Sequence, residues 1–520
     1  MKINREKMTL IIILLIQIVV YVFLGIQKTY IHMDEAYSIG LTNYDKVEIT
    51  DNEDFYNSWH TKDYYEDYIS INEDEKLDFS PVYENQKNDV HPPFYYLLLK
   101  IFSNFSIDNF SKWPGLILNS IILTLSNILV YKILKIITKN EKMSLIMCLV
   151  NGLVIASLES VMYIRMYALN ALMLLTIAYL HLINFRKEKI DIKNYLAIGT
   201  VTLLASLTHY YNVLYILVIF IIYIVYYLRK KQYKNILKYI ITMAIAAIFS
   251  LVIFPYSIQH IFFGYRGQGS LSSLAQGEKM LVGLTVYLYL ANTNIFNGTL
   301  SVMLLALICI TIYKFVKNRQ VTLKIENTNL MLITIPAIIY FLVVALTSPY
   351  MEIRYIIPVC SFIFIFVIYI LNLLLNKYLD AKKAQIIFKI ILCIILIMPI
   401  ITHQNINNLY LQHKEIVKEF EDKYHSLPTI YLFNKSQNRF LDDIYLFAKI
   451  DESYILDIET GSEEKLEEIF KDKNLENGLI VWENEGFERE EYLQNIIDFY
   501  GFKECKHLKR MNACDIYYLH

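Results

Sequence analysis

Long apolar runs dominate the pattern of hydrophobic and polar positions along this chain. A helix needs about 20 apolar residues to cross a hydrocarbon core about 30 Å thick. The pattern therefore predicts about 11 transmembrane helices, over residues 8–27, 115–135, 143–160, 162–183, 194–209, 211–228, 236–256, 299–315, 328–347, 355–374 and 384–402. The first run follows a basic start, "MKINREKM", but it is long for a signal core and lacks a small-x-small cleavage site, so we expect it to be retained.

Positive charge is unequally divided between the loops that join these runs. Alternate loops, beginning with the N-terminus, hold 24 Lys and Arg, whereas the short loops of the opposite face hold chiefly Arg266, Lys279 and Arg354. By the positive-inside rule the N-terminus is cytoplasmic, and an odd number of spans then puts the C-terminal end outside. We therefore expect a multi-pass protein of the cell membrane with a large external first loop, residues 28–112.

The pattern changes after residue 402. Short apolar segments, "PTIYLF", "SYILDI", "GLIVWEN" and "CDIYYL", predict strands, and the amphipathic segments between them predict helices. Such alternation is typical of a small α/β domain. The predicted fold class is therefore an α-helical multi-pass membrane protein with a small extracytoplasmic α/β domain, divided into a membrane domain over residues 1–402 and a soluble domain over residues 403–520.

Composition narrows the classes of partner. The chain of 520 residues is 55% hydrophobic, and its mean hydropathy of +0.36 is well above that of an ordinary soluble protein. Its net charge of −1 does not suggest a nucleic-acid partner. The partner that composition implies is the lipid bilayer.

The segment "IHMDEAYSIG" places two adjacent carboxylates, Asp34 and Glu35, directly after the first apolar run. Burial and a neighbouring carboxylate both change a carboxylate pKa, so this pair could supply a general base. The alternative is a pair of solvated acids, since the first loop contains 17 Asp and Glu against 7 Lys.

The segment "NDVHPPFYYLLLK" places Asp89 and His91 before two prolines and an apolar run. The prolines favour a first helical turn and the residue before them is extended, so Asp89 and His91 are expected just outside a helix that lies at the membrane interface. Either residue could contact a substrate or a metal. The alternative is that Asp89 caps the helix N-terminus and His91 lies at the interface.

Two arginines occur at predicted external helix ends. Arg165 lies with Tyr167 in "ESVMYIRMYALNALMLL", and Arg354 lies with Tyr355 in "SPYMEIRYIIPV". A guanidinium group presents a planar fork of donors that matches phosphate oxygens. The alternative is that the arginines extend to the lipid headgroups. At another external helix end, the segment "LTHYYNVLY" adds His209 and Tyr210, which more often serve packing.

The order of these motifs, "DE", "DVHPP", "RMYAL", "HYY" and "RYIIP", resembles one family over residues 1–375. It is similar to that of the polyprenyl-phosphate-sugar-dependent glycosyltransferases of the GT-C fold, family 39 broadly. Within this family the pattern resembles those of protein O-mannosyltransferases and bacterial aminoarabinose transferases of lipid A. This chain differs in lacking the extra external domain of eukaryotic mannosyltransferases and in its long acidic insert, residues 45–87.

The resemblance implies an enzyme that moves a sugar from a polyprenyl-phosphate donor to an acceptor hydroxyl on the external face. It implies Asp34 as the general base with Glu35 beside it. It further implies that Arg165 and Arg354, with Tyr355, bind the lipid phosphate.

The remaining residues of the motifs are expected to frame this site: Asp89, His91, Tyr167, His209 and Tyr210. No cofactor is certain. Whether a divalent metal takes part is left open by the resemblance. In aminoarabinose transferases a first-loop histidine is associated with a metal, and by this analogy His91 would be a ligand. Protein O-mannosyltransferases share the His-Pro-Pro and are not regarded as metal enzymes.

Three other classes fit parts of the pattern. A lipid or polysaccharide transporter would place ionisable groups near the bilayer midplane and often shows internal repeats, whereas here these groups fall at one face. An envelope polysaccharide polymerase would carry an arginine-rich external loop, whereas this first loop is acidic. A sensor would bind its ligand in the α/β domain. The acceptor, whether protein, lipid or wall polymer, is not specified by these residues.

Overall fold

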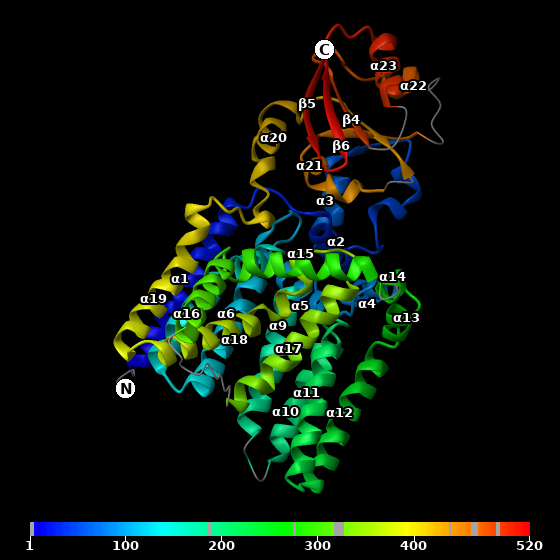
Figure 1. Cartoon of the computed structure of the whole chain (residues 1–520). Helices are drawn as coiled ribbons and strands as arrows, with labels where there is room; N and C mark the ends of the chain where they lie inside the picture. Colours follow the sequence, from blue (N-terminus) through cyan, green and yellow to red (C-terminus); the bar gives the residue numbers. More distant parts are fainter. Residues whose placement is uncertain are drawn as a thin grey trace. The chain divides into compact units, whose positions relative to one another are not determined.

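The computed structural model describes the whole chain except residues 1–4, 186, 188–189, 274–276, 317–326, 436–437, 459–465 and 485–488. The chain forms two compact units, coloured along the sequence in Figure 1. The helical unit comprises Met1–Leu24, Val90–Tyr95 and Leu116–Ile406. The sheet unit comprises Gly25–Asp89, Tyr96–Gly115 and Asn407–His520. The predicted division into domains at residues 402 and 403 stays a prediction.

Eight of the described helices are long and apolar enough to cross a membrane: α1 (Arg5–Gln27), α6 (Trp113–Thr138), α9 (Tyr167–Asn184), α11 (Asn212–Arg229), α12 (Tyr233–Ile253), α17 (Thr328–Thr347), α18 (Ile357–Tyr378) and α19 (Ala381–Ile401). The number becomes nine if α7 (Glu141–Asn151) and α8 (Ile155–Met162), which meet at a bend of 52°, are counted as one span. The two other predicted runs form the shorter helices α10 (Ile192–Ser206) and α16 (Leu300–Val316). The predicted class of a helical multi-pass membrane protein is thereby confirmed, with eight or nine spans among the described residues where about 11 were expected.

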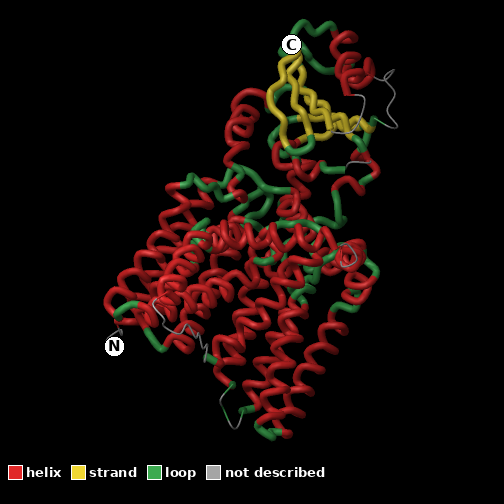
Figure 2. Tube along the Cα trace, in the orientation of Figure 1, coloured by secondary structure: helices red, strands yellow, loops and turns green. Residues whose placement is uncertain are grey.

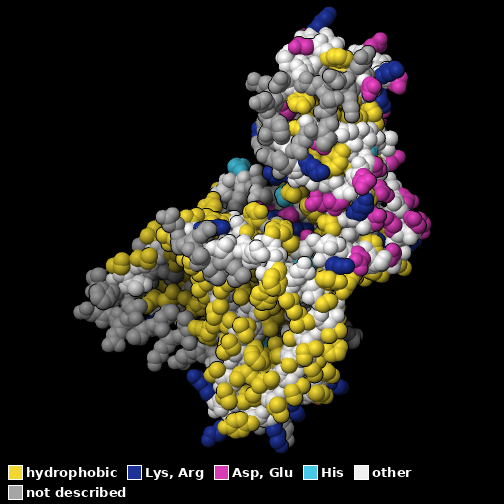
Figure 3. Space-filling model, turned by 90° about the vertical axis from the view of Figure 1, so that its right-hand side faces the viewer, with side chains coloured by type: hydrophobic (Ala, Val, Ile, Leu, Met, Phe, Trp, Pro, Cys, Tyr) yellow, Lys and Arg dark blue, Asp and Glu magenta, His cyan; other side chains and the backbone are white. Residues whose placement is uncertain are grey.

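The outer surface of the helical unit is apolar along its flank. Helix α12 exposes Leu237, Ile241 and Ile248, and Figure 3 shows hydrophobic side chains over this flank. Exposed Arg229 and Lys230 lie where α11 ends. An apolar flank that ends in positive charge is typical of a helical bundle in a bilayer. The side of the membrane on which each terminus lies stays a prediction.

Polar side chains from two helices hold the bend between α7 and α8. The Gln17 side-chain amide donates to the Cys148 carbonyl at 3.0 Å, and Tyr21 donates its hydroxyl to the Gly152 carbonyl at 2.9 Å. The Asn127 amide donates to both Gln17 and Tyr21, at 3.1 and 3.2 Å. A side chain at Gly152 would displace the Gln17 amide, because an added Cβ would lie 2.2 Å from it. The freed carbonyls of the bend are therefore satisfied inside the protein, as a lipid environment requires.

Three helices occupy a segment that the apolar pattern predicted as an external loop: α13 (Ser257–Phe262), α14 (Tyr265–Ser273) and α15 (Gly277–Ile295). Helix α15 runs across α17 (Figure 1), and an added Cβ at Gly283 would lie 2.3 Å from the Ala345 carbonyl oxygen of α17. The Tyr287 and Ser348 hydroxyl oxygens lie 2.7 Å apart, and Tyr287 also donates to the Tyr350 carbonyl at 3.1 Å. Helix α15 thus holds the turn that follows α17.

The first loop forms short helices: α2 (Met33–Asn43), α3 (Lys62–Ile69), α4 (Ser80–Asn88) and α5 (Phe94–Ser103). Two of them pack together, since α4 contacts α2. The Asn85 amide of α4 donates to the Tyr44 carbonyl, which follows α2, at 2.7 Å. Part of the acidic insert is therefore ordered by contacts within the sheet unit.

The sheet has six strands in the order β1-β3-β2-β4-β6-β5 and appears as the yellow trace in Figure 2. Its strands are β1 (Ser58–Thr61), β2 (Thr429–Phe433), β3 (Glu452–Asp457), β4 (Leu479–Asn484), β5 (Cys505–Met511) and β6 (Cys514–Leu519). Strand β2 pairs in parallel with β3 and β4, and the other pairs are antiparallel. All four strands predicted in the tail are present, as β2, β3, β4 and β6. Two further strands were not predicted: β5 in the tail and β1 from the first loop.

The core of the sheet unit lies against the central strands. Buried residues include Ile430, Val481 and Leu519, and the ring of Trp59 from β1 packs against this cluster. The helices of the tail are α20 (Lys414–Glu419), α21 (Ile444–Phe447), α22 (Leu466–Phe470) and α23 (Arg489–Tyr500). Strand β1 is joined to β3 in antiparallel register, with Trp59 opposite Tyr454, so the first loop is an integral part of this fold.

Replacing Gly283 by alanine should push α15 away from α17, because the added carbon would meet backbone that cannot rotate away. Overpacking of this kind costs about 1–3 kcal/mol, so the melting temperature of the purified protein should fall. Gly269→Ala in α14 is the matched control, since its nearest new neighbour would be 4.0 Å away. Equal melting temperatures for the two variants would contradict the close packing of α15 on α17.

Candidate functional site

Arg354 is joined to the turn before α9. Its Nη1 donates to the Tyr163 hydroxyl at 2.7 Å, and its guanidinium carbon lies 5.5 Å from the Tyr355 ring centre. The Tyr163 ring is parallel to that of Tyr167, with centres 6.1 Å apart, and Tyr167 meets Tyr355 edge to face at 6.2 Å. We call these residues, together with Arg165, the arginine–tyrosine cluster.

Arg165 lies in the turn between α8 and α9, where it is 6% exposed. Its backbone N–H donates to the Tyr163 carbonyl at 2.7 Å. The Asn119 amide of α6 donates to the same carbonyl at 2.7 Å, and the Tyr95 hydroxyl donates to Asn119 at 3.2 Å. Because Tyr95 and Asn119 are fully buried, this turn is held in one conformation by a neighbouring helix.

The start of α5 is attached to the turn between α10 and α11. The Phe94 N–H donates to the Leu207 carbonyl at 3.0 Å. This contact brings His91, which precedes the two prolines, next to His209, with ring centres 6.0 Å apart. The prediction that His91 lies just outside a helix is confirmed, because α5 begins at Phe94.

His209 joins the histidine pair to the arginine–tyrosine cluster. Its ring centre is 5.8 Å from that of Tyr167, and its Nδ1 accepts the Tyr211 N–H at 3.1 Å. Burial, with the neighbouring His91 and the positive charge of Arg165, lowers the pKa of His209 to about 3. His209 is therefore neutral at physiological pH.

The segment that carries Arg354 is held from two sides. Arg354 lies in a 3₁₀ turn, Ile353–Tyr355, and its Nε is 3.5 Å from a Glu352 carboxylate oxygen. The buried Tyr340 hydroxyl of α17 donates to the Tyr355 carbonyl at 3.2 Å. Together with the contacts of α15 to the preceding turn, these bonds fix where the guanidinium group points.

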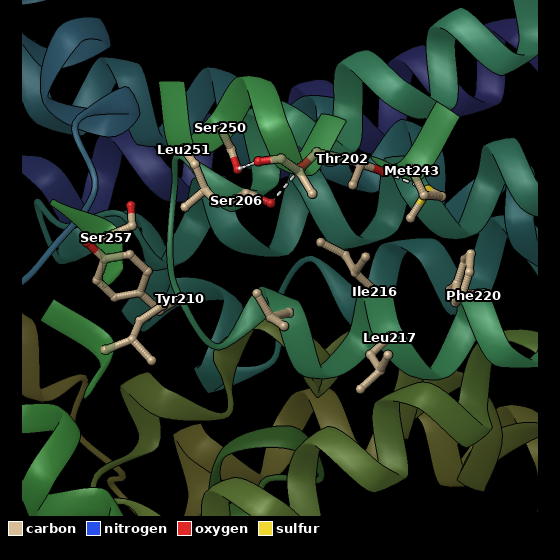
Figure 4. A pocket seen from close by; sticks show the side chains of 13 residues that line it. Thr202, Ser206, Tyr210, Ile216, Leu217, Phe220, Met243, Ser250, Leu251 and Ser257 are labelled. Carbon is tan, nitrogen blue, oxygen red and sulfur yellow. Dashed lines mark hydrogen bonds between the residues drawn. The ribbon is translucent and has the colours of Figure 1, made fainter. Parts of the chain in front are cut away.

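Tyr210 points from the same turn toward a different neighbour. Its hydroxyl oxygen lies 2.8 Å from His260 Nδ1 of α13, and its ring lines a groove of about 340 Å³ between α10, α11 and α12. Apolar side chains form most of the lining, among them Leu217, Phe220 and Leu251. Figure 4 shows Tyr210 and Ser257 at one end of this groove and Phe220 toward the other.

In the sheet unit, the Glu35 carboxylate forms a buried ion pair and accepts a backbone hydrogen bond. Its carboxylate lies 2.9 Å from Lys28 Nζ, and both side chains have no solvent exposure. It also accepts the His32 N–H at 3.0 Å as part of a capping box at the start of α2. Lys28 donates in addition to the Asn408 carbonyl at 2.6 Å. Pairing and hydrogen bonding of this kind offset the free energy that each charge loses when it is removed from water.

Asp34 lies beside Glu35 in the first turn of α2, and its side chain is 16% exposed. Its N–H donates to His32 Nδ1 at 3.1 Å, and one of its carboxylate oxygens lies 3.7 Å from the same nitrogen. A carboxylate in the first turn of a helix is stabilised by the helix dipole. Asp34 thus has the partial solvent access that Glu35 lacks.

Asp89 ends α4 as its C-cap residue, and its N–H donates to the Asn85 carbonyl at 2.9 Å. The alternative interpretation, in which Asp89 caps the N-terminus of the next helix, is wrong, because α5 begins only at Phe94. Asp89 belongs to the sheet unit and His91 to the helical unit. Among the residues that the structure describes, no group of three or more His, Cys, Asp and Glu side chains is placed to hold a metal ion. A metal role for His91 stays a prediction.

Two acids that the sequence analysis did not single out, Asp442 and Asp443, lie in the core of the sheet unit. Asp443 accepts from the Asn512 amide at 3.0 Å, and its carboxylate lies 3.4 Å from the Tyr431 hydroxyl and 3.3 Å from Cys514 Sγ. Burial and the charge of Asp442 raise the pKa of Asp443 to about 7. These two adjacent acids lie in a segment predicted as an amphipathic helix. Nothing in that pattern distinguishes buried acids from acids on the exposed face of the helix.

The fold defines a class: a multi-pass helical membrane protein that carries a separate mixed α/β unit. No protein-family model and no curated protein matches the chain. Two solved structures are similar to it, those of ArnT from Cupriavidus metallidurans bound to undecaprenyl phosphate and in the apo state. Each has a TM-score of 0.46 and 9% sequence identity, and each match covers 98% of this chain and 97% of the other. At this TM-score the likeness assigns no residue roles.

The raised pKa of Asp443 predicts a pH dependence of stability. An acid whose pKa is raised on folding stabilises the folded state fully at a pH below its unfolded value, near 3.8, and this contribution is lost as pH rises through about 7. Asp443→Asn should therefore remove part of the fall in melting temperature between pH 5 and pH 8, in a comparison of the full-length protein with and without the substitution. Parallel curves for the two proteins would contradict the assignment of a buried, titrating carboxyl.

Proposed function

We propose that this protein is a membrane glycosyltransferase that moves a sugar from a polyprenyl-phosphate donor to an acceptor hydroxyl on the external face of the cell membrane. The observation that supports this proposal most is the hydrogen bond from Arg354 to Tyr163, because these residues are 191 positions apart. It joins the two arginine-bearing turns of the helical unit. The motif order that resembles polyprenyl-phosphate-dependent transferases agrees with it.

The arginine–tyrosine cluster would stabilise the leaving group. When the bond between the sugar carbon and the lipid phosphate breaks, negative charge develops on the phosphate. Arg165 and Arg354 keep their charge at any physiological pH and present donors with the geometry of phosphate oxygens. Removing one such donor from a preorganised site typically costs about 10²–10³ in rate. Tyr355 and Tyr167 would hold the guanidinium groups in place, with neutral His209, Tyr210, His91 and Asp89 framing the site.

The acceptor hydroxyl needs a base, and Asp34 is the better candidate of the two adjacent acids. Glu35 is paired with Lys28 and has no solvent exposure, so we assign it the role of holding the start of α2. Asp34 has partial solvent access, and one of its carboxylate oxygens lies 3.7 Å from His32 Nδ1. In the proposed reaction Asp34 takes the proton of the acceptor hydroxyl as this oxygen attacks the sugar carbon. The proposal requires that Asp34 and the two arginines act on the same bound donor.

The groove beside Tyr210 suits the lipid part of the donor. It is open to the flank of the helical unit and lined mainly by apolar side chains of α10, α11 and α12. Tyr210 is adjacent in sequence to His209 of the cluster, so a chain that enters the groove would start near the proposed phosphate site. A transporter is less well supported, because its ionisable groups would lie near the midplane of helices, whereas the cluster occupies turns at helix ends.

Asp34→Asn should abolish sugar transfer, because an amide cannot accept the acceptor's proton. A general base contributes about 10²–10⁴ to the rate, so we expect a loss of at least about 100-fold. The assay offers radiolabelled polyprenyl-phosphate sugars, with membrane extracts as the source of acceptor, to the purified full-length protein. Asp45→Asn, an exposed acid of the same loop, is the control. Transfer by Asp34→Asn at the wild-type rate would eliminate Asp34 as the base.

Leu217→Trp should weaken the use of long-chain donors, because the indole would fill part of the groove. Losing the burial of about two methylene groups costs roughly 1.6 kcal/mol, which is about 15-fold in KM. Short-chain donor analogues should be used equally well by both proteins. Ile221→Trp is the matched control, since Ile221 is equally exposed on the same helix but lies outside the groove lining. Equal effects of the two substitutions would rule out the groove as the chain's site.

A further inference from the structure

Helix α5 turns apolar residues outward and buries its one charged residue. Ile101 is exposed, and Leu97 and Leu98 are partly exposed, whereas Lys100 is fully buried. On the surface of a water-soluble protein the charged residues of a helix face the solvent and the apolar stripe faces the core. Helix α5 has the reverse arrangement, which suits a helix whose outer side meets lipid.

The apolar side of α5 continues past the end of the helix at Ser103. Phe105 is 82% exposed, and its ring meets that of Phe102 edge to face, with ring centres 6.2 Å apart. The Phe105 N–H donates to the Phe102 carbonyl at 3.1 Å. The backbone that carries this exposed ring is therefore held in a turn.

The acidic insert adds a leucine at the same place. Leu77 is 62% exposed, and its N–H donates to the Asn104 side-chain oxygen at 3.0 Å. The Asn104 amide in turn donates to the Lys100 carbonyl at 2.6 Å. Leu77 thus lies beside the turn between Ile101 and Phe105. We call Leu77, Ile101 and Phe105 the apolar patch.

The backbone of Leu77 is strained. Its φ is 59°, in the left-handed region that is unfavourable for a leucine. Such strain persists where the surroundings impose it, and it often accompanies function. An exposed leucine in this conformation adds nothing to the core, so a contact outside the protein accounts for it. Neighbouring exposed apolar side chains of this kind mark an interaction surface.

The chain keeps the patch close to membrane helices on both sides. Phe94, whose N–H is bonded to the Leu207 carbonyl before α11, precedes Phe105 by 11 residues, which is about 17 Å along a helix. The membrane helix α6 begins at Trp113, eight residues after Phe105, and eight extended residues span at most about 28 Å. The bilayer surface is therefore within reach of the patch.

The charges near the patch in the sequence are mostly negative. Lys76 is paired with Glu73 at 3.1 Å, and further exposed acids are Asp74, Asp78 and Asp108. Anionic headgroups attract basic segments and repel acidic ones. A contact with lipid at this place must therefore be driven by burial of the apolar side chains.

We propose that the apolar patch inserts into the surface of the bilayer that holds this protein, so that the acidic insert serves in part as a membrane anchor. The occupant of the surface is lipid, into which the apolar face of an interfacial helix enters by about 5–10 Å. The contact fixes the depth of α5, the helix that His91 precedes. This inference does not depend on the proposed function.

The experiment adds one tryptophan to the full-length protein in phosphatidylcholine vesicles and measures its fluorescence as the difference from the wild type. In Leu77→Trp and Phe105→Trp, lipids brominated in the acyl chain should reduce this fluorescence at least about twofold, because an inserted indole meets the bromine. The effect should persist at high salt and needs no anionic lipid. Ile101→Trp carries the same comparison if either variant does not fold.

Phe499→Trp is the matched control, since Phe499 is a 53% exposed aromatic residue of the same unit, on α23. Its added fluorescence should respond to aqueous acrylamide and not to brominated lipid. The same response at residues 77 and 105 would overturn the inference. Protection of these positions from both quenchers would also overturn it, because a protein surface such as a second copy of the chain would then cover the patch.

A second comparison tests the bond that holds Leu77 in the patch. Asn104→Ala removes the acceptor of the Leu77 N–H, so the strained segment should leave its place. In this background the tryptophan at residue 77 should lose its quenching by brominated lipid, and the tryptophan at residue 105 should keep it. Asn109→Ala, at an exposed position close by, is the control. Equal quenching at residue 77 in both backgrounds would overturn the anchoring role of the insert.

Discussion

A bilayer offers no water to the backbone, and the rest of the helical unit depends on this constraint. Each interruption of a membrane helix must find its hydrogen-bond partners inside the protein. The bend between α7 and α8 finds them in Gln17, Tyr21 and Asn127. The turn that follows α8 finds them in Asn119. Because these partners fix the interruptions, the turn that carries Arg165 is rigid.

The same need for buried polar groups to find partners inside the protein determines the structure at the start of α2. Lys28 and Glu35 lose all contact with solvent, which is tolerated only because each charge faces the other and a further hydrogen-bond partner. The pair and its hydrogen bonds fix the first turn of the helix. A catalytic carboxylate needs this kind of support, because its geometry must be maintained within about 0.5 Å. Both units thus hold their candidate residues through contacts between distant parts of the chain.

Much of the fold could be predicted from the sequence because the bilayer imposes a strong and simple signal. All eleven apolar runs correspond to described helices, and eight or nine of these are long and apolar enough to cross a membrane. Helix α15 was missed because polar residues such as Thr285 and Asn294 interrupt its apolar positions. Strand β1 was missed because its four residues are too few to show an alternation, and its partner β3 lies about 400 positions away.

The candidate site was predictable in part for a related reason. Arg165, His209 and Arg354 stand out in a sequence because charged or titratable residues at helix ends are rare, and the structure brings these three positions into one set of contacts. Their roles in binding stay predictions. The hydrogen bond from Lys28 to the Asn408 carbonyl could not be foreseen, because it involves a backbone group, which no residue type reveals. A pattern of side chains shows candidates for chemistry but not the bonds that orient them.

The central claim is that the two arginines of the helical unit bind a phosphate carried by a lipid, and binding tests it most directly. The measurement is the Kd of the purified full-length protein for a polyprenyl phosphate, compared between wild type, Arg354→Ala and Arg229→Ala, an exposed arginine at the end of α11. A charge-assisted hydrogen bond contributes about 1.5–3 kcal/mol, so Arg354→Ala should raise the Kd about 10- to 100-fold while Arg229→Ala leaves it unchanged. Equal Kd values for all three proteins would contradict the account.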